Sequence, residues 1–523
     1  MSARCARCGA PAEQRCAGCS VPFYCGRQCQ RADWKQHRPL CQPLTVRQAA
    51  GVGRYTVAGR ALTAGQLLLR ELPLAAGPQL EAEPQCLGCG GLLAASAASC
   101  ARCRWPVCGD RCADSAAHAA ECPVLARDTG DRPAAGTEPC ARYDCILPLR
   151  VLLLRDQPRL WQKVEQLESH LEQRRDTAIF RDNQRHVVDY LRGRCGVQAD
   201  EQLLHRICGV LDVNAFSVRP RPGAGRRRGL FARASLLNHA CVSNTQLSLD
   251  GDTMLVRAAV PIAAGDEVTA SYVSAMEPTA RRQNFLWHGK YFRCQCRRCV
   301  DPTELGTHYG SHRCSECGGM MESQQPTDAA APWRCSGCRR AEPADQVRQL
   351  NARLLAERQA IPETAVPALE AFLARHAASP LHDANYHVLA VKQALAQAYG
   401  NVSGFQLDEL SEGRLVAKEA FCRQLIGLAQ TFEPGLCRLR GLLLLQLHHA
   451  QVTRAQRRHA AGAPPRQLLA ALEAAGQHVE EAVSVLGHEP ASTPEGGAML
   501  QLARDTLQGC YELAELVRTS LAR

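Results

Sequence analysis

Residues 229–244 read GLFARASLLNHACVSN, and residues 290–299 read KYFRCQCRRC. Both segments carry cysteines: Cys241 lies in the first, and Cys294, Cys296 and Cys299 follow in the second. Four cysteine thiolates form a common closed, tetrahedral ligand set for structural zinc. The spacing therefore predicts one zinc site that takes ligands from both segments. Between them, DEVTASY at residues 266–272 has the alternating pattern of a β-strand.

The same interpretation accounts for most of the 29 cysteines in the chain. Twenty-two cysteines and two histidines sort by spacing into six four-ligand sets, so we expect about six zinc ions per chain. Each set supplies four protein ligands, and no histidine or carboxylate lies where a catalytic site with an open fourth position would need one. These metals should therefore be structural. The five other sets are Cys5, Cys8, Cys25 and Cys29; Cys16, Cys19, His37 and Cys41; Cys86, Cys89, Cys108 and Cys112; Cys100, Cys103, His118 and Cys122; and Cys314, Cys317, Cys335 and Cys338.

Cysteine usage also indicates the compartment. A chain of 523 residues does not need disulfides to fold, so its Cys-x-x-Cys pairs indicate metal binding in a reducing compartment, the cytoplasm and/or the nucleus. The N-terminal MSARCARC has no apolar signal region. No apolar run approaches the ~18 residues that span a bilayer. We therefore expect no membrane association.

The net charge at first suggests a nucleic-acid partner. The formal value is +11, but zinc binding deprotonates the ligand thiols, and the zinc-loaded chain carries about +1. One local basic patch remains, with arginines at positions 219, 221, 226, 227 and 228, and we interpret it as a solvated hairpin tip. The charge therefore argues against direct nucleic-acid binding.

Composition and periodicity predict a multidomain α+β chain. We expect a zinc module at 1–45, a β-rich domain at 46–300, a zinc ribbon at 301–342 and a helical domain at 343–523. Two insertions interrupt the β-rich domain, a zinc module at 86–122 and a helical segment at 140–212. The C-terminal helices fit either a tetratricopeptide-like superhelix or a plain bundle, and the sequence does not separate the two. They are expected at 346–359, 364–377, 383–399, 413–430, 436–453, 466–485 and 495–521.

Specific sequence motifs add a family resemblance. The run FYCGRQCQRADWKQH at residues 23–37 resembles a MYND zinc finger, and 86–122 resembles a degenerate copy. The order NHxC, SY and CxCxxC behind such a finger resembles the SET and MYND domain-containing (SMYD) family, most closely its arthropod SmydA branch, over about residues 1–340. The resemblance implies a β-rich SET domain with a helical insert, a post-SET zinc segment at 290–300, a zinc ribbon and a tetratricopeptide-like tail.

The resemblance implies S-adenosylmethionine-dependent methylation of a histone or non-histone protein lysine, with a role in chromatin or transcription regulation. Asn214, Asn238 and His239 would contact the cofactor, Phe292 would stack on its adenine, and Tyr272 would line the site as the catalytic tyrosine. The MYND finger would bind proline-rich peptides, and the helical tail would recruit further partners.

One loop departs from the family pattern and keeps a second function open. The first cofactor loop usually reads Gly-x-Gly, whereas this chain has Gly53, Arg54 and Tyr55, with tyrosine at the second glycine. Glycine lets a backbone approach a ligand closely, so tyrosine could narrow or reshape the site. The alternative is a zinc-rich adaptor or corepressor with a weak or inactive SET core. Taken singly, Tyr272 and Phe292 also fit ordinary packing, and only the joint order of the motifs favours the enzyme.

Overall fold

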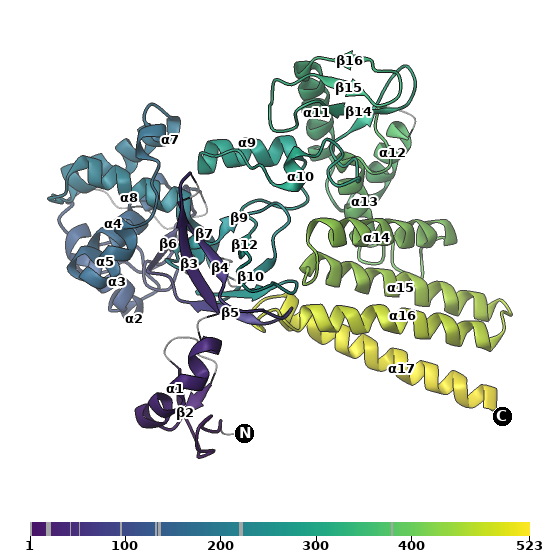
Figure 1. Ribbon diagram of the computed structural model, residues 1–523, viewed down its shortest axis with the longest axis horizontal. Helices are drawn as coiled ribbons and strands as arrows, with labels where there is room; N and C mark the ends of the chain where they lie inside the picture. The colour runs from purple at the N-terminus through teal and green to yellow at the C-terminus, as the bar shows by residue number, and fades with distance from the viewer. Residues whose placement is uncertain are drawn as a thin grey trace.

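A β-rich centre separates two helical regions in the computed structural model (Figure 1). The structure describes residues 3–16, 22–41, 43–51, 53–94, 97–130, 133, 138–218, 223–377 and 380–522. One helical region lies beside the central strands, and the other forms a stack that ends at the C-terminus. No helix in the described residues is both long and apolar enough to cross a membrane.

The N-terminal zinc module projects from the rest of the molecule (Figure 1). It consists of the short strands β1 (Gln14–Arg15) and β2 (Phe23–Tyr24) and the helix α1 (Arg27–Cys41). Its small core is made largely of cysteines packed around Tyr24. The Tyr24 hydroxyl donates a hydrogen bond to Asp33 over 2.6 Å. So little apolar surface indicates that metal binding supplies much of the module's stability.

The central β-region consists of several small sheets. β3 pairs with β4, β10 with β11 and β11 with β5, and β8 lies between β6 and β7, all antiparallel. β9 and β12 pair in parallel, which brings the NHAC and SY motifs together. The strands are β3 (Leu44–Ala49), β4 (Gly53–Ala58), β5 (Leu67–Glu71), β6 (Ala75–Pro78), β7 (Ala215–Val218), β8 (Arg227–Leu230), β9 (Asn238–His239), β10 (Thr245–Asp250), β11 (Thr253–Ala258) and β12 (Thr269–Ala270).

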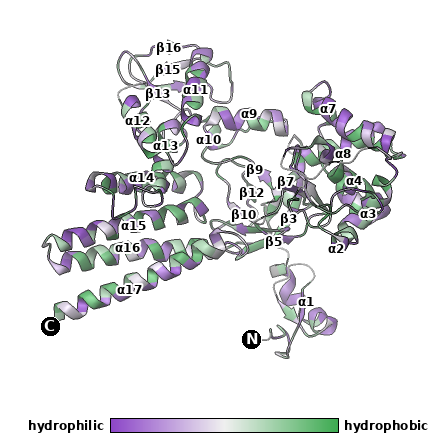
Figure 2. Ribbon diagram, turned by 180° about the vertical axis from the view of Figure 1, so that it is seen from behind, coloured by the Kyte–Doolittle hydropathy of each residue, from purple (hydrophilic) through white to green (hydrophobic). Residues whose placement is uncertain are grey.

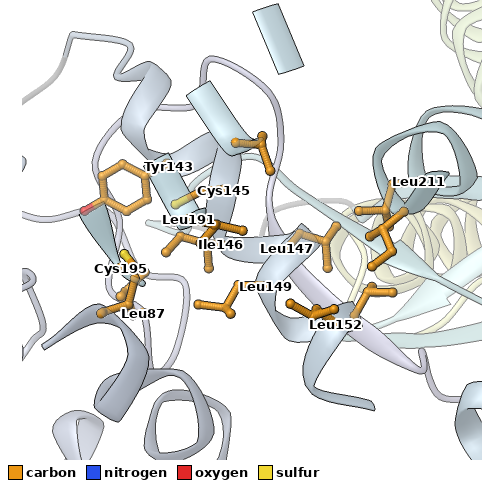
Figure 3. Packing of buried hydrophobic residues seen from close by; sticks show 14 of the residues in the cluster. Leu87, Tyr143, Cys145, Ile146, Leu147, Leu149, Leu152, Leu191, Cys195 and Leu211 are labelled. Atoms are coloured by element: carbon orange, nitrogen blue, oxygen red, sulfur yellow. The ribbon is translucent and has the colours of Figure 1, made fainter. Parts of the chain in front are cut away.

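Both insertions lie between β6 and β7 and share one apolar core (Figure 3). Trp105 of the zinc module packs edge-on against Tyr143 of the helical insert. Of the seven cysteines outside the zinc sets, Cys145, Cys195, Cys208, Cys422, Cys437 and Cys510 are buried. The elements are α2 (Asp110–Ala113), α3 (Ala116–Leu125), η1 (Ala141–Cys145), α4 (Ile146–Leu152), η2 (Leu153–Asp156), α5 (Pro158–Glu165), α6 (Leu171–Arg174), α7 (Ala178–Asn183), η3 (Gln184–Val188), η4 (Tyr190–Arg194) and α8 (Glu201–Asn214).

The prediction that the arginines at 219–228 form a solvated hairpin tip is wrong for two of them. Arg227 and Arg228 begin β8, and Arg228 is buried against Asp212 of α8 over 2.7 Å. Arg227 pairs with Asp252 over 2.9 Å. Tertiary pairing therefore neutralises part of the patch, whereas positions 219–222 lie outside the described residues.

The segment with the CxCxxC motif and the zinc ribbon follow the sheets. α9 (Thr279–Lys290) leads into the CxCxxC segment, which ends in α10 (Arg297–Val300). The ribbon is a four-stranded antiparallel sheet in chain order. Its strands are β13 (His312–Arg313), β14 (Met320–Ser323), β15 (Trp333–Cys335) and β16 (Ala341–Glu342).

The C-terminal helices stack largely in chain order: from the second helix onward each packs against the next, whereas the first packs against the third (Figure 1). This serial packing favours the superhelix over the closed bundle. Apolar and polar residues alternate along α15 to α17, as expected for helices that bury one face (Figure 2). The helices are α11 (Ala344–Gln359), α12 (Val366–His376), α13 (Tyr386–Ala398), α14 (Glu412–Phe432), α15 (Arg438–Ala460), α16 (Pro465–Leu486), η6 (Glu495–Met499) and α17 (Leu500–Ala522).

The helical stack joins the β-region at a close backbone contact. The amide of Leu436 donates to the carbonyl of Ala259 over 3.0 Å. Gly435 has a φ of 78°, and a Cβ there would overlap the same carbonyl, so only glycine fits. The stack therefore forms a fixed neighbour of the central sheets.

Candidate active site and metal sites

Five of the six expected ligand sets gather as tight clusters. In each set the four ligand atoms lie within 4.8 Å of one another. In the sixth, Cys16 Sγ lies 3.3 Å from His37 Nε2 and 3.6 Å from Cys41 Sγ, whereas Cys19 lies outside the described residues. Thiolate and imidazole donors at this spacing fit tetrahedral zinc.

The second zinc module has a buried supporting network. His118 Nε2 lies 3.4 Å from Cys103 Sγ, and its Nδ1 lies 3.3 Å from Glu121. Glu121 also accepts hydrogen bonds from Arg150 of α4 over 2.7 Å. A carboxylate behind a histidine ligand fixes the ring and its tautomer. This network fastens the module to the helical insert.

A buried arginine offsets part of the negative charge of the zinc site at Cys241. Four thiolates around one zinc ion leave a net charge of about −2, which is costly to bury alone. Arg282 has no exposed surface, and its Nε lies 3.2 Å from Cys241 Sγ. Its Nη1 donates to Glu304 over 2.8 Å. Although burial lowers the Arg282 pKa, Glu304 and the thiolates outweigh it and raise that pKa above its usual value.

The network continues into the helical stack. Glu304 also pairs with Arg298, whose guanidinium carbon lies 3.2 Å from the ring centroid of Phe432 in α14. Arg298 is fully buried and donates to the carbonyl of Ala275 over 2.7 Å. The Cys241 zinc site and the helical domain are therefore joined through two buried arginines and one carboxylate.

A cavity of about 1400 Å³ lies beside this zinc site. It collects seven of the eight residues that the sequence assigned to the cofactor, and Tyr55 of β4 does not line it. Cys294 and Cys296 of the zinc site also line it. The seven residues are Gly53, Arg54, Asn214, Asn238, His239, Tyr272 and Phe292.

The NHAC strand presents amide and imidazole groups in this cavity. Asn238 Nδ2 donates to Glu267 over 2.8 Å. His239 Nδ1 accepts the backbone N–H of Tyr272 over 3.0 Å, so its proton lies on Nε2, which is 3.2 Å from Cys241 Sγ. Burial lowers the His239 pKa to about 4, which keeps the ring neutral. His239 thus connects the zinc ligand directly to the tyrosine backbone.

Tyr272 holds its hydroxyl in a defined direction. The hydroxyl donates to the carbonyl of Leu237 over 2.7 Å. Its oxygen lone pairs therefore remain able to accept an N–H from a ligand. Burial raises the Tyr272 pKa to about 12, so the hydroxyl stays protonated near neutral pH. Its ring lies edge-on to Phe292, with centroids 6.5 Å apart.

A further part of the cavity wall comes from the helical insert and the start of β4. Asn214 ends α8, and its Nδ2 donates to the carbonyls of Glu168 and Val210 over 2.7 and 2.8 Å. Arg54 donates to Gln166 over 3.2 Å, which ties the β3–β4 turn to the insert. Gly53 has a φ of 78°, a conformation that favours glycine, and nothing lies within 4 Å of where its Cβ would be.

Several cavity residues were missed by the sequence interpretation. His170 and Tyr291 both have left-handed backbone conformations, and their rings lie 5.1 Å apart at the cavity. Such conformations in non-glycine residues often mark functional sites. Lys290 also lines the cavity, and its position within KYFRCQCRRC was the available signal. Arg438 of α15 reaches it from the helical stack, which no local pattern indicates.

Comparisons with known proteins agree with this organisation. The MYND finger family matches residues 5–41. SmydA-8 isoform A of Drosophila melanogaster is 29% identical over 323 residues, which covers 60% of this chain and 67% of that protein. Isoform B is 32% identical over 303 residues, which covers 56% of this chain and 65% of that protein.

More distant relatives match shorter segments. The N-lysine methyltransferase SMYD2 of Rattus norvegicus is 32% identical over 90 residues, 17% of this chain and 21% of that protein. A solved SET domain of LSMT, bound to lysine and AdoHcy, aligns over 93% of this chain at 11% identity. Its TM-score of 0.24 is too low to establish a shared fold. The chain thus spans at most about two thirds of the length of these curated relatives.

Proposed function

We propose that this chain is a SmydA-type member of the SET and MYND domain-containing proteins and that it is an S-adenosylmethionine-dependent protein-lysine methyltransferase. One observation carries the proposal. The residues of three separate sequence motifs, Asn238, Tyr272 and Phe292, line a single cavity beside the Cys241 zinc site. The methyltransferase relatives support the same activity.

The cavity walls suit a nucleoside sulfonium ligand. Phe292 offers an aromatic face for a base, and Asn214 and Asn238 offer amide groups for an amino-acid moiety. The volume of about 1400 Å³ leaves room for a substrate side chain as well. When bound, S-adenosylmethionine would supply an activated methyl group. Tyr55 does not line this cavity, which supports cofactor entry past the Gly53-Arg54-Tyr55 loop.

The residues around Tyr272 suit amine alkylation. A substrate lysine must lose its proton before it attacks, because its usual pKa is about 10.4. Partial burial in the cavity would lower that pKa by desolvation. The Tyr272 oxygen, fixed by its bond to Leu237, would accept one N–H of the amine and orient its lone pair. Alignment then provides most of the acceleration.

The test is a methylation assay on the zinc-loaded chain with candidate protein substrates. Tyr272→Phe removes only the hydroxyl, so we expect cofactor binding to persist while turnover falls by about a hundredfold. Phe216→Leu, another aromatic substitution at the cavity, is the matched control for general disturbance of the cavity. Full activity in Tyr272→Phe would remove the assigned role of the hydroxyl.

We also propose that the MYND finger and the helical stack recruit protein partners. Trp34 on α1 is partly exposed beside His37, which gives the finger an aromatic surface suited to a proline-rich peptide. A titration with proline-rich peptides should show a lower affinity for the Trp34→Ala variant than for the unchanged chain. We propose a role in transcription and a location in the cytoplasm or nucleus. The identity of the bound partners would test both.

A further inference from the structure

One lysine of this chain lies in the active-site cavity itself. The sequence contains only five lysines, at positions 35, 163, 290, 392 and 418. Lys290 ends α9 and is the one lysine among the described residues that line the cavity. A proposed lysine methyltransferase thus carries its own amine beside its assigned catalytic tyrosine.

Lys290 is held by two carbonyls and one ring. Its Nζ donates to the carbonyl oxygens of Asp212, over 3.3 Å, and Val213. Both carbonyls belong to the last turn of α8, where helical carbonyls lack partners within the helix. The Nζ also lies 5.8 Å from the ring centroid of Tyr272.

These contacts suit a nucleophilic amine. A neutral amine has two N–H donors and one lone pair. With both donors bound to carbonyls, the lone pair is left for a third direction, and Lys290 borders the cavity. Burial lowers the Lys290 pKa to about 8, with Asp212 raising it and Arg228 lowering it. A substantial neutral fraction is therefore present at mildly alkaline pH.

Given the methyltransferase function proposed above, we infer that Lys290 is a self-methylation site that accepts one methyl group from S-adenosylmethionine in the same cavity. The Nζ lone pair forms the new N–C bond as the methyl–sulfur bond breaks. That bond's electron pair stays on sulfur, which gives S-adenosylhomocysteine. The proton lost from the ammonium passes to solvent.

The two carbonyls also predict how far the reaction proceeds. A monomethylated ammonium keeps two N–H groups and can still satisfy both carbonyls. A second methyl would leave one carbonyl without its donor, which is unfavourable in a buried setting. We therefore expect monomethylation.

Lys418 provides a matched control within the same chain. Burial lowers its pKa to about 8 as well, and its Nζ donates to the carbonyls of Ala396 and Tyr399 and to the side-chain oxygen of Gln446, over 2.6 Å each. It lies in α14, fully buried, and does not line the cavity. If a lowered pKa were sufficient, both lysines would be modified. Lys35 and Lys163 are exposed, so methylation of either one would indicate transfer from one molecule to another.

The experiment incubates the zinc-loaded full chain with S-adenosylmethionine and no other substrate, followed by peptide mass spectrometry. The expected result is the mass of one added methyl on Lys290, none on Lys418, and a first-order rate constant unchanged by tenfold dilution. Tyr272→Phe should lack the modification. A methyl already present on Lys290 after expression, and absent in Tyr272→Phe from the same host, gives equal support.

Two outcomes would overturn the inference separately from the function. If the chain binds S-adenosylmethionine and methylates an added protein while Lys290 stays unmodified, self-methylation fails and the enzyme stands. If no cofactor binds, both fail. Methyl on Lys35 or Lys163 alone would indicate transfer between molecules and would also contradict the inference.

A second readout needs no turnover. Trace acetylation of the cofactor-free, zinc-loaded chain should label Lys290 with a half-maximal pH near 8, because Lys290 lines the cavity. Lys418 should resist labelling. S-Adenosylhomocysteine should protect Lys290 but leave Lys163 unchanged. Equal labelling of Lys290 with and without that ligand would place the amine away from the cofactor and contradict the inference.

Discussion

Asn238 and His239 hold the cavity wall through strand pairing and through a contact with the zinc ligand Cys241. The parallel pairing of β9 with β12 fixes their backbones. His239 then joins Cys241 to the backbone of Tyr272. A disturbance at the zinc site would therefore reach the tyrosine through a single imidazole ring.

Asn238→Ala tests the amide wall. The side chain contacts Glu267 and lines the cavity, so its loss removes hydrogen bonds without opening the core. We expect affinity for S-adenosylmethionine to fall about tenfold, or about 1.4 kcal/mol, at an unchanged melting temperature. Calorimetric titration measures this. Asn401→Ala, at an exposed position in the helical domain, is the control, and equal affinities in all three proteins would contradict the assignment.

At the scale of elements, the post-SET segment and the helical stack act as one structural unit. Arg282, Glu304 and Arg298 are buried together between the Cys241 zinc site and Phe432. Removing one partner from such a network leaves a buried charge with too few partners. This explains how a distant helical domain can stabilise the cavity that it borders.

Arg298→Met tests this connection. The substitution keeps an apolar side chain near Phe432 but removes one of the two arginines that pair with Glu304, which then keeps Arg282 and the backbone N–H of Thr279. We expect the free energy of unfolding to fall by about 3 kcal/mol. Urea denaturation followed by fluorescence measures this. Arg281→Met breaks only the partly exposed pair with Glu277, so it should cost under about 1 kcal/mol. Equal effects of the two substitutions would contradict the network.

Much of this arrangement could be predicted from sequence because it depends on local spacing. The Cys-x-x-Cys pairs specify their own metal sites, and the C-terminal helices follow from apolar periodicity. Sequence could not predict the His170–Tyr291 contact or the position of Lys290 against α8, since both depend on how distant elements pack. The burial of Arg228 was missed for the same reason, because its partner Asp212 lies on another element.

At the scale of the whole molecule, metal sites take the place of a large apolar core in two separate regions. The N-terminal module and the ribbon each have small cores made largely of cysteines, whereas the inserted module adds its cysteines to the large core that it shares with the helical insert. The metals therefore contribute to folding directly. The stacked helices, which bury Leu-rich faces, need none.

Zinc content tests this account. Metal analysis of the purified chain should give six zinc ions per molecule. Removal with a strong chelator should unfold the zinc modules and abolish cofactor binding, because the Cys241 site borders the cavity. Circular dichroism should show that most helical signal persists. Four or fewer zinc ions per chain would contradict the ligand grouping.

The most direct test of the central claim is calorimetric titration of the zinc-loaded full chain with S-adenosylmethionine. The shared cavity of Asn238, Tyr272 and Phe292 predicts saturable binding at one site per chain. S-Adenosylhomocysteine should compete for that site. Absence of heat and of competition at millimolar ligand would contradict the methyltransferase and leave a zinc-rich adaptor.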